Sequence, residues 1–280
     1  MSIASWQRMA VACLLAAIPG SIYAVDGVIL IDQVHALAGN ITPGDTPGFP
    51  VTITQPGSYK LSGNLTVADA NTTAIRIAAD YVTLDLNGFS IIGPVTCTSS
   101  PAVCPPAGTG VGVDAHQPEG TPSPRSFRVV NGTVRGMGNL GIFITGLGSS
   151  VENVRADTNA GGGILAAGTV NNSAATLNGS FGIFAITVRG SYMSDNHDVG
   201  LQLDGSGGVA SDNIASFNGS HGISAPNGTV TNNTTVRNVQ FEISALCPSV
   251  VVNNTVVSNT AGSITTSRDG CVLVNNATRP

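Results

Sequence analysis

The sequence predicts an all-β solenoid, a parallel β-helix of roughly nine or ten coils with about 20 residues each. A small residue followed by an aliphatic one recurs every 18 to 22 residues. The aliphatic positions are Ile142, Ile164, Ile183, Leu201, Ile223, Ile243 and Ile264. Within each unit apolar and polar residues alternate, as in a strand with one buried face. The units are rich in Val, Ile, Thr, Asn and Gly, which favours short strands and turns over helices. One coil cannot bury its apolar face alone, so we expect the coils to stack.

Two asparagine columns accompany this repeat. Five residues before an aliphatic position stand Asn159, Asn178, Asn196, Asn218, Asn238 and Asn259. Six residues earlier stand Asn131, Asn153, Asn172, Gly190, Asp212, Asn232, Asn253 and Asn275, the first and last of which extend the column beyond the six. An asparagine at a bend tolerates left-handed backbone geometry. Its amide can also bond to the same residue one coil away, at about 4.8 Å. We therefore predict a structural role for both columns.

The N-terminal residues 1–24 have the pattern of a secretory signal. Arg8 is the lone positive charge, an apolar core spans Met9 to Ile18, and Ala24 suits cleavage. The core is too short to span a bilayer. We therefore expect an exported protein, periplasmic or extracellular, with no membrane insertion after cleavage and with residues 25–280 as a single β-helix domain.

The first part of this domain, residues 25–50, is expected to form an N-terminal cap and a loop. Ile31, Val34 and Leu37 have helical spacing, and Gly39 would end the helix. A short amphipathic helix here would cover the open end of the solenoid. Regular strands follow, with clean alternation in 82–88.

Residues 93–125 break the repeat. Seven of the fifteen prolines lie in this stretch, together with Cys97 and Cys104. We predict a disulfide-tied loop that leaves one coil, with Val111 to Asp114 as a strand returning to the stack.

Four cysteines remain after the signal, and an even number in an exported chain indicates disulfides. Cys97 and Cys104 would close a small loop. Cys247 and Cys271 occupy the same place in consecutive coils, which lie close enough for a disulfide. Neither pair has the CxxC spacing of a zinc site, and no calcium-loop motif is present, so we predict no metal or cofactor.

The chain resembles the right-handed parallel β-helix repeat proteins of the pectin-lyase-like superfamily, in particular small exported bacterial members. The resemblance is carried by 57–65, by 82–88 and by the later Asn/Gly-Ile units, and covers most of the mature chain. It implies a right-handed helix with any ligand on the outer face of one sheet, beside long loops. The superfamily includes polysaccharide lyases, hydrolases, epimerases and proteins with no assigned activity, so the fold does not select a function.

The repeat also predicts which side chains face outward on one sheet. They are Arg76, Asp114, Phe143, Leu165, Phe184, Gln202, Ser224, Ser244 and Thr265, and two positions further on His116, Thr145 and Asp204. Because the loop leaves and rejoins near Asp114, we expect a groove at that end.

Two kinds of role are open for these residues. In a ligand site, Phe143 and Phe184 would stack on sugar rings, while Gln202 and Asp204 would form hydrogen bonds. In a catalytic site, Asp114 and His116, two apart on one strand, would share a face and exchange protons beside Arg76. Alternatively, these are the ordinary polar residues of a solvated sheet.

Two functions follow. The first, which we favour, is a binding or scaffold module for a glycan or a cell-envelope component. The alternative is a carbohydrate-active enzyme of the polysaccharide lyase, hydrolase or epimerase kind. A polyuronate enzyme needs cations or a Ca²⁺ bridge, yet Lys60 is the single lysine and the arginines are scattered. A net charge of −5 also disfavours nucleic acid as a partner.

Two histidines bear on a possible hydrolase function. The segments 195–198 and 219–222 contain His197 and His221 and faintly resemble motifs of polygalacturonase-like enzymes. In the repeat, however, His197 falls in a turn column, and His221 shares the column of Phe181 and Phe241, which predicts a packing role. We therefore set the hydrolase interpretation aside.

Overall fold

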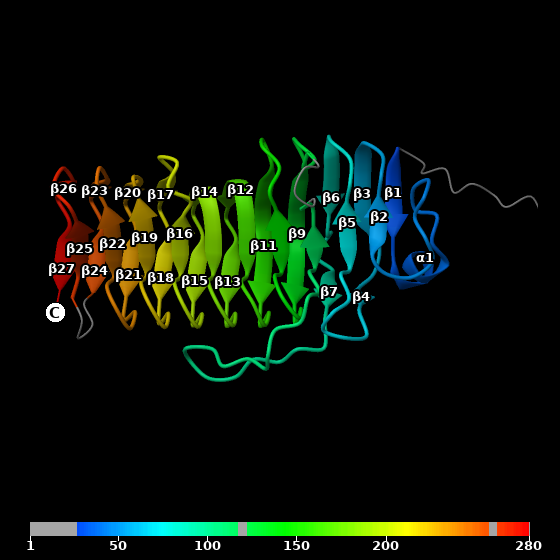
Figure 1. The fold of residues 1–280 in the computed structure, drawn as a ribbon, viewed down its shortest axis with the longest axis horizontal. Coiled ribbons are helices and arrows are strands. Elements are labelled where there is room, and N and C mark those ends of the chain that lie inside the picture. Colours follow the sequence, from blue (N-terminus) through cyan, green and yellow to red (C-terminus); the bar gives the residue numbers. More distant parts are fainter. Residues whose placement is uncertain (1–26, 117–121, 258–261, 280) are drawn as a thin grey trace, which may run out of the picture.

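The computed structural model describes residues 27–116, 122–257 and 262–279. The expected signal, residues 1–24, lies outside these ranges. The described chain winds into one elongated solenoid of about ten coils, and its strands pair in parallel with the strand one coil away (Figure 1). The fold class predicted from the repeat is confirmed.

The strands form three stacks that run the length of the molecule. Sheet A consists of β2 (Val51–Ile53), β5 (Ile75–Ile77), β8 (Val113–Asp114), β10 (Ile142–Ile144), the first halves of β12 (Ile164–Asn171) and β14 (Ile183–Arg189), β16 (Leu201–Leu203), β19 (Ile223–Pro226), β22 (Ile243–Leu246) and β25 (Ile264–Ser267).

Sheet B consists of β1 (Val28–Ile31), β3 (Gly57–Leu61), β6 (Val82–Asp85), the first halves of β9 (Arg128–Arg135) and β11 (Ser150–Asp157), the second halves of β12 and β14, β17 (Val209–Ser211), β20 (Thr229–Thr231), β23 (Val250–Val252) and β26 (Val272–Val274). Sheet C consists of β4 (Leu65–Thr66), β7 (Ser90–Ile92), the second halves of β9 and β11, β13 (Ala174–Thr176), β15 (Tyr192–Ser194), β18 (Ile214–Ser216), β21 (Thr234–Val236), β24 (Thr255–Val257) and β27 (Ala277–Arg279).

The core fills the space enclosed by the three sheets. One residue of each alternating pair points inward, so Ile142, Ile164 and Ile183 follow one another one coil apart and are fully buried. Each buried aliphatic side chain of this size contributes about 1.5–3 kcal/mol. Tyr59 and Phe127 are the largest side chains in the core.

The corner between sheets C and A carries the first predicted asparagine column as a buried ladder. Asn178 Nδ2 donates to Asn196 Oδ1 at 2.9 Å, and the backbone N–H of Asn178 donates to the same oxygen at 3.1 Å. This arrangement repeats from coil to coil through Asn159, Asn178, Asn196, Asn218 and Asn238. At the far end the carboxylate of Glu242 takes the place of the next amide. The predicted amide ladder is confirmed for these members, while Asn259 lies outside the described residues. The left-handed bend is taken by the residue before each asparagine, namely Thr158, Leu177, Asp195, Phe217 and Arg237.

The corner between sheets B and C differs from the prediction, which assigned both the bend and the ladder to one residue. The second column supplies the bend: its members have φ between 46° and 60° and are exposed on the surface. One pair, Asn153 Nδ2 to Asn131 Oδ1 at 3.4 Å, also forms the predicted bond between coils. From Asn172 onward the residue that follows each bend, as Asn213 follows Asp212, points inward and forms a second ladder. Its members are Ser173, Ser191, Asn213, Asn233, Asn254 and Asn276. A left-handed residue directs its own side chain outward, so the inward amide must come from its neighbour.

From β9 onward the coils differ in length at only one of their three corners, whereas before β9 residues 93–112 enlarge the corner between sheets C and A. From sheet B to sheet C the interval between equivalent inward residues is constant, as from Val170 to Ala175. From sheet C to the next sheet A it is again constant, as from Ala175 to Ile183. The turn from sheet A to sheet B absorbs every difference: β14 continues through it without a break, whereas five residues separate β16 from β17. The two constant corners are those that carry the ladders.

A short helix, α1 (Gln33–Ala38), covers the N-terminal end of the stack (Figure 1). Asp32 caps it by accepting a hydrogen bond from the backbone N–H of His35, and Gly39 ends it. The predicted apolar face is wrong, because Val34 and Leu37 are 74% and 55% exposed. Ile31 belongs to β1, which pairs with β3, and this pairing turns Ala36 rather than Val34 toward the core.

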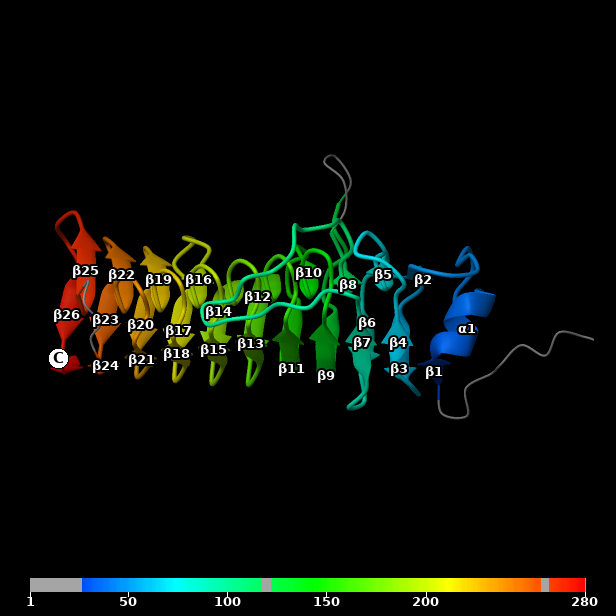
Figure 2. The ribbon, with the colours of Figure 1, turned by 90° about the horizontal axis from the view of Figure 1, so that it is seen from below.

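Both predicted disulfides are present, Cys97–Cys104 and Cys247–Cys271, with Cα atoms 4.3 and 4.9 Å apart. The first lies in residues 93–112, which leave the stack after β7 and run along its outside across several coils before β8 (Figure 2). Within the described ranges, no helix is long and apolar enough to cross a membrane.

Candidate functional site

The predicted outward column of sheet A is in register. Each member pairs with the next, one coil away, in the order Arg76, Asp114, Phe143, Leu165, Phe184, Gln202, Ser224, Ser244 and Thr265. The structure therefore places all the candidate strand residues on one face.

The N-terminal members of this column contact one another and form a closed group. Arg76 Nη2 lies 3.3 Å from Asp114 Oδ2, and the backbone N–H of His116 donates to Asp114 Oδ1 at 2.9 Å. The imidazole of His116 stacks on Phe143, with ring centroids 4.5 Å apart. These contacts leave Asp114 only 7% exposed. Asp114 thus meets His116 through its backbone, and the imidazole covers the Phe143 ring that was expected to hold a sugar.

The other predicted residues are distributed differently. Phe184 tilts against Phe181 with centroids 6.1 Å apart. Asp204 accepts hydrogen bonds from the backbone and hydroxyl of Ser206, and so shapes its own turn. Gln202 lines a hollow of the surface. The structure therefore separates the predicted site into a closed group at Asp114, a turn at Asp204 and a hollow at Gln202.

Two adjoining hollows lie further along the solenoid, with volumes of about 440 and 310 Å³. Both are in the size range of small-ligand sites. They share Asp198 and Ser220 as lining residues. We call the two together the turn groove. Its lining residues are Pro101, Val103, Ser180, Phe181, His197, Asp198, Val199, Gln202, Gly219, Ser220, His221, Ser224, Val239 and Gln240.

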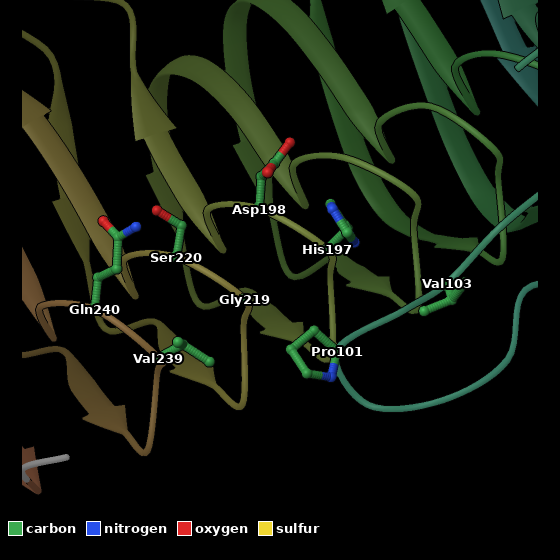
Figure 3. Close-up of a pocket in the computed structure, with 8 residues that line it drawn as sticks. All are labelled: Pro101, Val103, His197, Asp198, Gly219, Ser220, Val239 and Gln240. Carbon is green, nitrogen blue, oxygen red and sulfur yellow. The ribbon is translucent and has the colours of Figure 1, made fainter. Parts of the chain in front are cut away.

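The floor of the turn groove is built by successive turns between sheets C and A. The backbone N–H of Asp198 donates to the carbonyl of Ser180, that of Ser220 to Asp198, and that of Gln240 to Ser220. These four polar residues consequently form a column with one member per coil, about 4.8 Å apart. Figure 3 shows three of them, from neighbouring turns, with the loop opposite.

The disulfide-tied loop forms one wall of the groove through Pro101 and Val103. Its tip is docked by a hydrogen bond from the backbone N–H of Ala102 to the carbonyl of Asp195, 2.8 Å long. His197 Nδ1 lies 2.9 Å from the carbonyl oxygen of Ala102. A carbonyl only accepts, so this nitrogen carries the hydrogen.

Both hollows lie further along the solenoid than the position predicted for a groove, beside Asp114. Neither hollow includes Arg76, Asp114 or His116. The reason is the course of the loop, which extends along the solenoid and lands on the coil of His197 instead of folding back over the coil that it leaves (Figure 2).

His221 occupies the packing column that the repeat predicts. Its imidazole stacks on Phe241 with centroids 5.8 Å apart, and the backbone N–H of Phe241 lies 3.3 Å from Nδ1. Burial lowers the pKa of His221. The ring is therefore neutral at pH 7, and its edge also lines the turn groove.

Sequence reasoning missed Asp198 and its neighbours Ser180 and Ser220 as site residues. The hydroxyl of Ser180 donates to Asp198 Oδ2 at 2.9 Å. The repeat placed these residues correctly in turns, but only the landing point of the loop, far away in sequence, turns them into a groove.

The described residues contain no cluster of three or more His, Cys, Asp or Glu side chains that could hold a metal ion.

No protein-family model matches the sequence, and no curated protein matches it. Among solved structures, the A-module of the Azotobacter vinelandii mannuronan C-5 epimerase AlgE4 is similar, with a TM-score of 0.57, 15% identity, and coverage of 90% of this chain and 84% of that chain. A double mutant of the periplasmic alginate epimerase AlgG gives a TM-score of 0.45, 12% identity, and coverage of 82% and 76%.

The Dettilon tailspike protein gives a TM-score of 0.46 and 16% identity, and covers 82% of this chain, which spans 51% of the tailspike. Such low identities bear on the fold and leave activity open. The chain thus shares its parallel β-helix fold with the AlgE4 A-module.

Proposed function

We propose that this protein is a glycan-binding module and that the turn groove is its binding site. The observation that supports this most directly is the composition of the groove. A column of hydroxyl, carboxylate and amide side chains runs beside rings and aliphatic groups, on a rigid stack of coils.

The polar and apolar side chains of the groove match the hydroxyl groups and the C–H faces of a sugar. Sugar hydroxyls can bond to Asp198, Ser220 and Gln202, while the C–H face of a ring can pack on Phe181 or against Val103. Ligand sites generally combine apolar walls with a few polar groups that fix orientation.

Binding is a better fit than hydrolysis at this position. Glycoside hydrolysis generally uses two carboxyl groups about 5–9.5 Å apart. Of the described residues that line the turn groove, Asp198 alone carries a carboxyl group.

Carbohydrate chemistry at Arg76, Asp114 and His116, of the lyase or epimerase kind, is the second candidate. It is supported by the ion pair of Arg76 with Asp114 and by the position of His116 above Phe143. Because the residues of this group already bond to or stack on one another, it is the weaker candidate.

An exported location, periplasmic or extracellular, belongs to the same proposal. The two disulfides suit an oxidising compartment.

A glycan-array screen of residues 25–280, followed by mass spectrometry of each bound polysaccharide, tests this function. We expect binding without turnover, and loss of binding in Asp198→Ala. Asp269→Ala removes an exposed carboxylate of the last coil and serves as the matched control. Shortened or unsaturated products that disappear in Asp114→Ala would establish the second candidate instead. No binding to any glycan would refute the proposal.

A further inference from the structure

We propose that the turn groove selects a neutral, hydroxyl-rich glycan and rejects polyuronates, and that the glycan chain lies along the solenoid axis. This inference rests on the proposed glycan-binding function and names its ligand class.

The charge of the groove is the first argument. Among its described lining residues, Asp198 is the only one with a carboxylate, and neither lysine nor arginine is present. His221 is partly buried beside Phe241, and this burial lowers its pKa. The guanidinium of Arg237, two residues from Val239, lies over the Phe217 ring, 5.9 Å from its centroid. A uronate carboxylate entering the groove would therefore meet a negative charge and no cation to offset it.

The surroundings of Asp198 provide the second argument. Ser180 holds Oδ2 by a hydrogen bond of 2.9 Å, which orients the carboxylate. Oδ1 accepts no hydrogen bond from any residue that the structure describes. A carboxylate oxygen is a strong acceptor for a hydroxyl donor, and every neutral sugar offers several hydroxyls. The exposed, oriented Oδ1 thus matches a neutral glycan and opposes an anionic one.

The direction of the bound glycan chain follows from the walls of the groove. The polar column from Ser180 to Gln240 runs from coil to coil, parallel to the axis. The loop tip, with Pro101 and Val103, stands on one side, and Gln202 and Ser224 of sheet A lie on the other. An extended chain along this column would present hydroxyls to one coil after another.

Affinity electrophoresis through gels that contain a single polysaccharide tests the inference. The neutral probes are mannan, galactan and hydroxyethyl cellulose, and the polyuronates are alginate and polygalacturonate. At low ionic strength we expect retardation by at least one neutral polymer and by neither polyuronate.

Variants of Asp198 sharpen this test. Asp198→Asn should weaken neutral-glycan binding about tenfold, because a hydrogen bond to a charged acceptor is lost. Asp198→Lys should abolish that binding and create retardation by polygalacturonate that disappears at high ionic strength. The same two replacements at Asp269, exposed on the last coil, should change neither.

The outcomes separate the two proposals. Retardation of the unaltered protein by a polyuronate as strong as by any neutral polymer would overturn the inference and leave glycan binding intact. Neutral binding that Asp198→Asn and Asp198→Lys do not alter would also overturn it. A protein retarded by no polysaccharide would remove both.

Discussion

At the scale of single residues, each inward asparagine side chain makes hydrogen bonds to backbone groups that would otherwise lack a partner in the turn. Asn196 Nδ2 donates to Asn218 Oδ1 and to the carbonyl of Ala175, while its own oxygen accepts two hydrogen bonds from Asn178. The amide is fully buried and fully bonded. Because a buried donor without a partner costs about 1–3 kcal/mol, each ladder member also protects its neighbour.

We expect Asn196→Ala to lower the free energy of unfolding by about 3 kcal/mol, since it leaves two donors of Asn178 without an acceptor. Urea unfolding followed by circular dichroism measures this loss. The matched control is Asn172→Ala, at an exposed bend with φ of 46°. There the cost is the left-handed backbone alone, about 1 kcal/mol. Equal losses at the two sites would contradict the distinction between bend and ladder.

Glu242 closes the first ladder with a carboxylate, and its side chain is fully buried. Burial raises the pKa of Glu242 above its ordinary value of 4.5, although the two hydrogen bonds from Asn238 oppose the shift. Below pH 4.5 the carboxyl group is protonated in both the folded and the unfolded chain. As pH rises further the unfolded chain releases this proton first, so the folded state loses stability until the raised pKa is passed.

Glu242→Gln removes this titration. We expect the free energy of unfolding of the variant, minus that of the unaltered protein, to rise with pH from about 4 upward and then to level off. Urea unfolding across this pH range measures the difference, in which the effects of other carboxylates cancel. A difference that does not change with pH would show that burial does not control this group.

At the scale of elements, the disulfide-tied loop is the part of the chain that converts a row of turns into a groove. Its tip is held by the Cys97–Cys104 bond and by the hydrogen bonds of Ala102 to Asp195 and His197. The last coil is fastened separately by Cys247–Cys271. The two disulfides therefore have different roles: Cys97–Cys104 supports the wall of the groove, and Cys247–Cys271 fastens the last coil.

Replacing both Cys97 and Cys104 by Ser should free the loop tip. We expect amide exchange at Ala102 to become at least about tenfold faster and glycan binding to weaken, while the melting temperature changes little. The same double replacement at Cys247 and Cys271 should cost about 3 kcal/mol, because it opens a larger loop, and should leave binding intact. Exchange mass spectrometry and electrophoresis separate these effects. Undiminished binding without Cys97–Cys104 would show that the loop wall is dispensable.

At the scale of the whole molecule, the two ends of the solenoid are finished differently. Helix α1 covers the first coil, whereas the strand residues Val272, Leu273 and Val274 of the last coil are 48%, 49% and 43% exposed. Each coil gains stability from its neighbours on both sides. A coil with one neighbour and an open core is therefore the least stable part of the described stack.

A matched pair of substitutions tests this gradient. Leu201→Ala, in the fully buried middle of the stack, should cost about 3 kcal/mol. Leu273→Ala makes the same chemical change on the last coil and should cost less than about 1 kcal/mol, because half of that side chain is already in water. Amides of β26 and β27 should also exchange faster than those of β12 and β14. Equal costs for the two substitutions would mean that the last coil is as well covered as the middle.

The repeat predicted the coils, the register of the outward column and the Cys247–Cys271 disulfide, because these depend on spacing that recurs along the chain. It assigned the bend and the ladder to one residue, since Asp212 and Asn213 are neighbours and spacing alone does not say which points inward. It did not predict the turn groove, because the contact of Ala102 with Asp195 joins segments almost a hundred residues apart. Such a docking contact leaves no periodic trace in the sequence.

The corner between sheets A and B, where coil length varies, has a practical consequence. No asparagine ladder passes through it, and the turn at Gly205 and Gly207 already places five residues between β16 and β17 beside its ungapped neighbour in β14. Extra residues spliced between these glycines would bulge into solvent and leave the register of all three sheets unchanged. The solenoid is therefore suited to carry grafted peptides, one per coil, at a spacing set by the stack.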